Sequence, residues 1–191
     1  MSAHPEVPGL SLVPDWITAE DERVLLAEVD AAPWRDDLQR RVQHYGWRYD
    51  YKARRVDASM RLGPLPPWAA RLAARLAEEG RDARAPDQVI VNEYAPGQGI
   101  ARHVDCVPCF GPVVLSLTLG SGCVMDLQGP DGAKVPVALP PRGLLVLAGE
   151  SRVRWSHAIA GRKSDVVGGA KVARGRRVSL TFRTVRVAAG A

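Results

Sequence analysis

The stretch RRVSLTFRTV, residues 176–185, alternates polar and apolar side chains along its length. Successive side chains of a strand point to opposite sides, so this period of two predicts a β-strand with one polar and one apolar face. The polar face carries two arginines and two hydroxyls: Arg177, Ser179, Thr181 and Arg183. Burying such a face is costly unless an anion meets the arginines, and a dicarboxylate would meet both. The alternative is an edge strand with a solvated basic face.

The period of two recurs along the chain from about residue 88. Short β-rich runs alternate with turn formers such as APGQG and GPDG. The runs are QVIVNEY (88–94), VVLSLTL (113–119), CVMDL (123–127), KVPVALP (134–140), GLLVLAG (143–149) and VRWSHAIA (153–160). Many short, closely spaced strands predict an antiparallel sandwich or barrel. Residues 161–175 show no period, and we expect a mobile loop there.

Two helices are expected before residue 88. Thr18 followed by Asp21 predicts a helix start, with three apolar residues on one side of that helix: Val24, Leu25 and Val29. The second helix has Pro67 in its first turn and Gly80 as its stop. Its apolar residues recur at four-residue spacing: Trp68, Leu72 and Leu76. Both helices are expected to cover the core.

Composition limits the class of protein. The chain has 191 residues, 46% hydrophobic and 25% charged, which is typical of one globular domain and excludes a disordered chain. No apolar run approaches the roughly 20 residues that cross a bilayer, and the first residues lack a secretory signal, so we expect a cytoplasmic protein without membrane contact. The net charge of +5 favours an anionic partner, with nucleic acid the first candidate.

The segment RRVQHYGWRYDYKARR, residues 40–55, interleaves aromatic and basic side chains. Its aromatic residues alternate as in a strand: Tyr45, Trp47, Tyr49 and Tyr51. Aromatics among cations can stack on a base while the cations bind its phosphates. The alternative is an amphipathic strand whose aromatic face packs on the core.

Two histidines and an aspartate form a candidate metal site. His103 and Asp105 lie two apart in an extended segment and so share a face, and His157 lies in a later strand. Two histidines and a carboxylate can occupy one face of an iron(II) ion and leave three positions open. The three cysteines speak against a disulfide framework, and we expect Cys106 and Cys109 to be small apolar side chains on a loop near the metal, exposed to oxidation.

In this combination the chain resembles the AlkB family of iron(II)- and 2-oxoglutarate-dependent dioxygenases. The resemblance rests on His-x-Asp, the distal histidine and Arg-x-Ser-x-Thr-x-Arg, and on NEYAPGQGIARH (92–103), SLTLGSGCVMDL (116–127) and LLVLAGESR (144–152). It covers residues 40–186 and is greatest with the members that modify the wobble uridine of tRNA. It implies a mainly β protein with flanking helices and a double-stranded β-helix core, of the jelly-roll, cupin-like kind. It also implies one domain over residues 1–191, with a helical and nucleotide-lid region at 1–87 and the β-helix core at 88–186.

The resemblance also implies roles for individual residues. The iron ligands at the catalytic centre are His103, Asp105 and His157. The co-substrate 2-oxoglutarate is bound near the metal by Arg183 with Asn92, and at its distal carboxylate by Arg177 with Tyr94 and Ser179. The nucleotide-recognition lid contains Tyr45, Trp47, Arg48, Tyr49 and Tyr51. Founding members of the family usually have Asn where this chain has Ser179, so the polar contact there is shorter.

The function implied is oxidation of a modified or alkylated base in nucleic acid. This is either oxidative demethylation or hydroxylation of a tRNA wobble-uridine side chain, with tRNA or alkylated DNA or RNA and molecular oxygen as partners of a monomer. One alternative is a 2-oxoglutarate oxygenase that acts on a protein or a small molecule. Another is an inactive nucleic-acid-binding module, which the complete ligand set disfavours.

Overall fold

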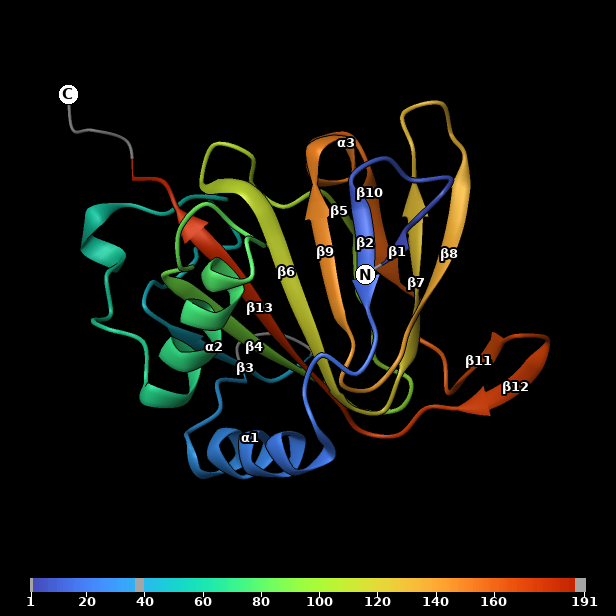
Figure 1. The fold of residues 1–191 in the computed structure, drawn as a ribbon, viewed down its shortest axis with the longest axis horizontal. Coiled ribbons are helices and arrows are strands. Elements are labelled where there is room, and N and C mark those ends of the chain that lie inside the picture. The colour runs from blue at the N-terminus through green and yellow to red at the C-terminus, as the bar shows by residue number, and fades with distance from the viewer. Residues whose placement is uncertain (1, 37–39, 188–191) are drawn as a thin grey trace.

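The computed structural model describes residues 2–36 and 40–187, and two antiparallel sheets form its body (Figure 1). Within the described residues, the larger sheet has seven strands in the order β1-β2-β9-β6-β13-β4-β3, and the smaller has four in the order β5-β10-β7-β8. The strands of the larger sheet are β1 (Ser2–Ala3), β2 (Leu10–Val13), β3 (Val42–Tyr45), β4 (Gln88–Tyr94), β6 (Phe110–Gly120), β9 (Leu144–Ala148) and β13 (Arg177–Val185). Those of the smaller are β5 (Ile100–His103), β7 (Cys123–Gln128), β8 (Lys134–Leu139) and β10 (Ser156–Ile159). The predicted β-helix (jelly-roll) fold is confirmed.

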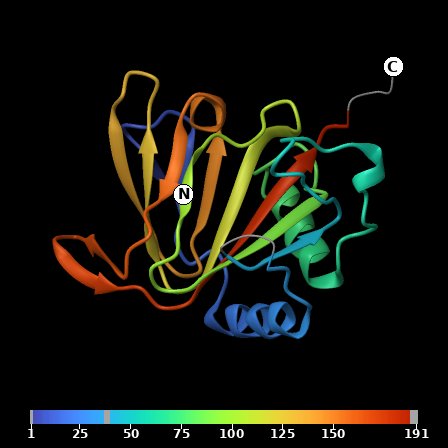
Figure 2. The same cartoon turned by 180° about the vertical axis from the view of Figure 1, so that it is seen from behind.

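The helices pack on the outer face of the larger sheet. Helices α1 (Ala19–Ala31) and α2 (Pro67–Glu78) lie away from the smaller sheet in both views (Figures 1 and 2), and a short α3 (Gly149–Val153) follows β9. The Thr18 hydroxyl accepts from the Asp21 amide at 3.1 Å and caps α1, which confirms the predicted start. Leu25 and Val29 are buried, but Val24 is 38% exposed, so its predicted place on the apolar side is wrong. Helix α2 also begins at the predicted proline.

Strand β13 lies in the middle of the larger sheet, between β4 and β6. Its apolar side chains Val178, Leu180 and Phe182 are fully buried in the core under the helices. Its polar side chains point the other way, into the space between the two sheets. A second apolar core from β2, β7, β8 and β9 fills the rest of that space, so the polar face of β13 lines a cavity inside the protein.

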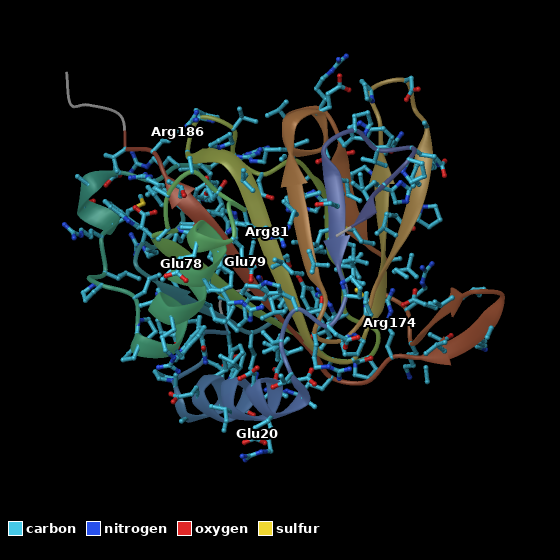
Figure 3. All side chains as sticks on the ribbon, viewed as in Figure 1. Glu20, Glu78, Glu79, Arg81, Arg174 and Arg186 are labelled. Atoms are coloured by element: carbon cyan, nitrogen blue, oxygen red, sulfur yellow. A yellow bond between two sulfur atoms is a disulfide. The ribbon has the colours of Figure 1, made fainter. Side chains whose placement is uncertain are left out.

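Residues 161–175 do not form the loop that the sequence analysis predicts. They contain a hairpin of β11 (Ser164–Val167) and β12 (Ala170–Ala173), which projects from the body in both views. Its turn is Gly168-Gly169, both at positive φ, a typical two-residue hairpin turn. Arg174 lies at its base (Figure 3). The Arg174 guanidinium donates to the Asp165 carboxylate at 2.6 Å and 2.8 Å. The hairpin shows no period because water surrounds most of its side chains, Val166 being 67% exposed.

The region before residue 88 contributes β2, which the sequence does not predict, and β3, which lies in the segment 40–55 predicted as a strand. Strand β2 pairs with β9, and β3 pairs with β4, so both belong to the same sheet as β13. None of the helices in the described part of the chain is long and apolar enough to span a bilayer. The predicted division at residue 87 stays a prediction, and residues 1, 37–39 and 188–191 of the predicted domain lie outside the described residues.

Candidate active site

A cavity of about 340 Å³ opens between the two sheets and brings together most of the predicted site residues. The predicted metal ligands line it, together with the four polar residues of β13 and two residues of β4, Asn92 and Tyr94. Tyr49 and Tyr51 also line it, whereas Tyr45, Trp47 and Arg48 do not. Four arginines outside β13 are near its mouth or walls: Arg40, Arg54 and Arg102 line it, and Arg152 lies behind Asp105.

The three candidate metal ligands meet because β5 and β10 are neighbouring strands. The register places His157 directly opposite His103, with their ring centroids 4.3 Å apart, and Asp105 follows two residues after the end of β5. One ligand atom from each residue lies within 4.8 Å of the others. The Nδ1 of His103 is 2.8 Å from the Ala101 carbonyl oxygen, which can only accept, so Nδ1 donates a proton and Nε2 keeps a free lone pair.

The surroundings keep these side chains in the protonation states that metal ligands need. Burial lowers the pKa of His157 to about 4, although the Asp105 carboxylate opposes this shift, so the imidazole is neutral at pH 7. Burial by itself would raise the pKa of Asp105, but the Arg183 guanidinium and the two imidazoles hold it well below its ordinary value. The site therefore offers a neutral imidazole at His157 and a carboxylate at Asp105, and with His103 these make the two-histidine, one-carboxylate set that suits iron(II) with open positions.

The two arginines of β13 have donors available for an anion. Arg183 donates to Asp105 Oδ1 at 2.5 Å, and Arg177 donates to the Thr118 hydroxyl at 3.0 Å while its guanidinium lies 5.3 Å from the centre of the Tyr94 ring. Among the described residues, Arg177 Nε and Arg183 Nε and Nη1 are buried without a hydrogen-bond partner. Buried donors without partners are rare, and carboxylates satisfy guanidinium groups well. The cavity therefore fits a dicarboxylate such as 2-oxoglutarate beside the metal ligands.

Asn92 and Arg183 line the same cavity, and their joint role at the co-substrate stays a prediction. The register places Asn92 opposite Ser179, and Arg183 opposite Gln88. The Asn92 amide oxygen accepts from Arg40 Nε at 2.9 Å, and Arg40 also lies over the Tyr94 ring at 5.9 Å. In the sequence Arg40 is one of several cations of the segment 40–55. Its contact with Asn92 could not be predicted, because the two residues are 52 positions apart.

The predicted continuous aromatic strand from residue 45 to 51 is wrong. Strand β3 ends at Tyr45, and Gly46 turns the chain at φ +77°, where a Cβ atom would lie 1.9 Å from the Asp87 carbonyl oxygen. Tyr45 therefore packs in the core against Trp68, with ring centroids 5.5 Å apart. Trp47 packs on a separate small core. Arg48 is exposed and does not line the cavity. The substrate-binding roles expected for Tyr45, Trp47 and Arg48 therefore find no support in their positions.

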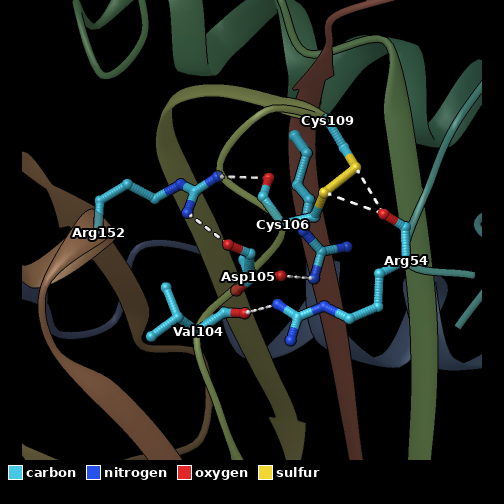
Figure 4. Close-up of a disulfide and its surroundings, with 7 residues drawn as sticks. Arg54, Val104, Asp105, Cys106, Cys109 and Arg152 are labelled. Carbon is cyan, nitrogen blue, oxygen red and sulfur yellow. Dashed lines mark hydrogen bonds and ion pairs between the residues drawn. A yellow bond between two sulfur atoms is a disulfide. The ribbon is translucent and has the colours of Figure 1, made fainter.

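Cys106 and Cys109 form a disulfide, which corrects the expectation of two separate small side chains (Figure 4). The loop places their α-carbons 5.3 Å apart, a normal separation for bridged cysteines. Behind the loop the buried Arg152 donates to the carbonyl oxygens of Asp105 at 3.0 Å and Cys106 at 3.2 Å. The role of Arg152 is not predicted from the sequence. The one feature that could have indicated it is a charged residue at the end of the otherwise mostly apolar LLVLAGESR, residues 144–152.

Comparisons with known proteins agree on one family. The family model described as the 2OG-Fe(II) oxygenase superfamily matches residues 9–183. The Macaca fascicularis protein named tRNA (carboxymethyluridine(34)-5-O)-methyltransferase ALKBH8 is 39% identical over 206 residues, covering 94% of this chain and 31% of that protein. The Danio rerio protein named probable RNA/DNA demethylase ALKBH6 is 30% identical over 208 residues, covering 93% of this chain and 86% of that protein. The chain spans about a third of the vertebrate ALKBH8 proteins that it matches.

Solved structures share the fold at low sequence identity. A structure of OsALKBH1 has a TM-score of 0.70 and 19% identity, covering 93% of this chain and 97% of that chain. A prolyl-4-hydroxylase from Pseudomonas putida has a TM-score of 0.60 and 17% identity, covering 95% of this chain and 94% of that chain. At these identities the likeness shows the arrangement of strands around the cavity and says nothing of the substrate.

Proposed function

The chain belongs to the AlkB family of the 2OG-Fe(II) oxygenase superfamily, and we propose from this premise that its cavity oxidises a base of nucleic acid. The observation that carries the proposal is the meeting of a two-histidine, one-carboxylate set with two partly unsatisfied arginines in one cavity. In this proposal iron(II) is held by His103, Asp105 and His157. The cavity mouth between Tyr51, Arg54 and Arg102 is where the base enters.

In the proposed reaction the residues of the cavity have separate roles. Bound iron(II), with 2-oxoglutarate and oxygen, supplies the oxidation of a substrate C–H bond to C–OH, while 2-oxoglutarate becomes succinate and carbon dioxide. Arg177 and Arg183 orient the co-substrate by charge-assisted hydrogen bonds to its two carboxylates. Arg183 also keeps Asp105 ionised, and the buried position of His157 keeps it neutral, so neither ligand needs to lose a proton when the metal binds.

The rim of the cavity suits a polyanion. Tyr49 and Tyr51 lie in contact at 5.0 Å between ring centres, and Tyr51 lies beside Arg40 at 6.0 Å. The exposed Arg102 belongs to β5 and precedes His103, and the exposed Arg54 donates to the Val104 carbonyl just after that strand at 3.1 Å. Aromatic faces can stack on a base while guanidinium groups bind its phosphates. The names of the vertebrate ALKBH8 relatives favour tRNA, and a monomer acting on an exposed loop base is the form we propose.

Oxidative demethylation is the second candidate chemistry, favoured by the relatives named as demethylases. Demethylation and side-chain hydroxylation give different products. A hydroxylated N-methyl group breaks down and its carbon leaves as formaldehyde, whereas a hydroxylated side-chain carbon stays on the base. The alternative function is a 2-oxoglutarate oxygenase that acts on a protein or a small molecule. That alternative predicts no affinity for oligonucleotides. For either function we propose that the protein acts in the cytoplasm.

The test measures binding and turnover of two probes, a tRNA anticodon stem-loop and an N-methylated single-stranded DNA. We expect the stem-loop to bind and to increase succinate formation, and Arg102→Gln to reduce the salt dependence of binding by about one unit. Arg23→Gln is the matched control, because Arg23 lies on α1 away from the cavity and is expected to leave the slope unchanged. Binding of neither probe, or an equal effect of both variants, would contradict a nucleic-acid substrate. Formaldehyde release from the DNA probe alone would select demethylation.

A further inference from the structure

The Cys106–Cys109 disulfide lies in the loop after Asp105 and faces the backbone of Arg54 (Figure 4). Cys106 directly follows Asp105, and its side chain lines the cavity. Both sulfur atoms lie 3.3 Å from the carbonyl oxygen of Arg54. The Arg54 guanidinium in turn donates to the Val104 carbonyl at 3.1 Å. The pair therefore contacts both the loop that holds one metal ligand and the segment that carries Tyr49 and Tyr51.

The two cysteines also belong to a small apolar core that fixes these parts together. Both are buried, at 5% and 6% exposure, and they pack with Val56, Met60, Phe110 and Val185. Trp47 and Tyr49 pack against the same core, with Tyr49 5.4 Å from Phe110 between ring centres. A change in the size or linkage of the sulfur pair in this core is transmitted to its neighbours, because packed interiors have little spare volume.

On the other side, Arg152 holds the loop by its backbone. Its guanidinium donates to the carbonyl oxygens of Asp105 and Cys106, at 3.0 Å and 3.2 Å. Arg183 holds the Asp105 carboxylate directly, and the Arg152 hydrogen bonds and the disulfide fix the loop behind it, so the carboxylate lies beside His157, at 3.7 Å between Oδ2 and Nε2. In the disulfide form the three ligand atoms are already gathered within 4.8 Å. The bridged pair therefore accompanies an assembled metal site.

We propose that Cys106 and Cys109 are a reversible thiol-oxidation site whose disulfide form raises the affinity of the metal centre. The inference rests on the metal site of the proposed function. The oxidant is a peroxide, small enough to reach Cys106 through the cavity, and the reductant is a dithiol. Two sulfurs that are not bonded need more room than a bonded pair, so reduction pushes the loop after Asp105 and the Arg54 carbonyl apart.

The oxidation balances in two steps. The Cys106 sulfur, as its thiolate, attacks one peroxide oxygen; the O–O bond breaks, giving a sulfenic acid and a hydroxide that takes up the released thiol proton as water. The Cys109 sulfur then attacks the Cys106 sulfur, the S–O bond breaks, and the hydroxyl leaves with the Cys109 proton as a second water. Two thiols are oxidised to one disulfide, and one peroxide is reduced to two waters. Exchange with a dithiol reverses the reaction.

The first measurement asks whether the pair reacts. Reduced protein is treated with hydrogen peroxide and then with an alkylating reagent, and peptides are analysed by mass spectrometry. We expect the peptide with Cys106 and Cys109 to lose two hydrogens and escape alkylation, and dithiothreitol to reverse this. Irreversible oxidation, or a pair that stays reduced, would overturn the proposal.

The second measurement compares the affinity for Mn(II), a stand-in for iron(II) that air does not oxidise. Oxidised and reduced protein are titrated calorimetrically, with the reductant removed under nitrogen. We expect about tenfold tighter binding in the oxidised form, because ordering about one loop residue on binding is then no longer required. Hydrogen exchange in residues 47–60 is expected to be faster in the reduced form.

Two variants separate the possible causes. The double variant Cys106→Ser/Cys109→Ser is expected to bind Mn(II) like reduced protein under both treatments. Cys123→Ala, which removes a buried thiol outside the pair, is expected to keep the tenfold difference. Equal Mn(II) affinity of oxidised and reduced wild-type protein overturns this inference alone. Absence of Mn(II) binding in both forms overturns the proposed metal site and this inference with it.

Discussion

Arg177→Met removes a buried guanidinium whose position in the cavity leaves one donor unsatisfied. Arg177 is 4% exposed, its Nε atom has no partner among the described residues, and Nη2 donates to Thr118. If a carboxylate of 2-oxoglutarate accepts two hydrogen bonds from this side chain, each charge-assisted bond contributes about 1.5 to 3 kcal/mol. The sum of about 3 to 6 kcal/mol corresponds to a loss of roughly two to four orders of magnitude in affinity.

The same substitution is expected to leave the stability of the co-substrate-free protein unchanged or higher. Methionine fills a similar volume, and replacing a buried charge that lacks full pairing by an apolar side chain is often neutral or stabilising. Arg183 is a poorer probe, because its removal would also leave the buried Asp105 carboxylate without its cation. Arg177→Met therefore separates co-substrate binding from folding.

The assay is calorimetric titration of Mn(II)-loaded protein with 2-oxoglutarate, beside urea unfolding of the free protein. Ser179→Ala is expected to lower affinity only about tenfold, since the hydroxyl donates a single hydrogen bond to the carboxylate, about 1.5 kcal/mol at the lower end of the same range. Arg154→Met, at an arginine 56% exposed at its side chain beside α3, is the matched control and is expected to change neither quantity. The reasoning is refuted if Arg177→Met binds 2-oxoglutarate like the wild type, or if its loss of affinity is matched by a loss of stability.

Two further predictions concern stability. Hydrogen bonds from Arg174 and Arg162, opposed by burial, hold the pKa of Asp165 at about 2, below its ordinary 3.8; the ionised form stabilises the fold above pH 3.8, and this contribution of about 2 kcal/mol is lost as the pH falls toward 2. Between pH 6 and pH 3, urea titrations are expected to show a decrease about 1 kcal/mol larger in the wild type than in Asp165→Asn, because about half of the contribution is lost at pH 3; equal decreases in the two proteins would count against it. Tyr45→Ala is expected to cost about 3 kcal/mol by opening a hole beside Trp68, while the folded fraction keeps its nucleic-acid affinity, and a selective loss of that affinity in anisotropy titrations would return Tyr45 to the substrate site.

The elements that could be predicted from the sequence are those with one buried apolar face. Strand β13 alternates polar and apolar residues and β4 contains a short apolar run, because a core lies on at least one side of each strand. Helix α2 shows an apolar stripe for the same reason. The hairpin at 164–173 lies in solvent on most sides, so no burial imposes a period on it. Its Gly-Gly turn directly after Val166 and Val167 was the available signal.

The candidate site could be predicted only in part, because sequence patterns report local strand geometry and not the contacts between distant segments. His103 and Asp105 could be placed together because their spacing fixes their faces locally, and β13 fixes both arginines. Alternation alone could not reveal that Gly46 turns the chain at positive φ, which sends Tyr45 into the core and leaves Tyr51 at the cavity. The contact of Arg40 with Asn92 depends on the pairing of β3 with β4, which periodicity does not specify.

The central position of β13 has a consequence for how the protein is synthesised. Its two neighbours, β4 and β6, are made earlier and are not paired with each other, so until residue 185 has left the ribosome they face each other across an empty place in the sheet. Such exposed edges invite pairing with other chains. A nascent chain that stops before residue 177 has His103, Asp105 and His157 but neither Arg177 nor Arg183. We therefore expect the last strand to complete the sheet and the cavity in a single late step.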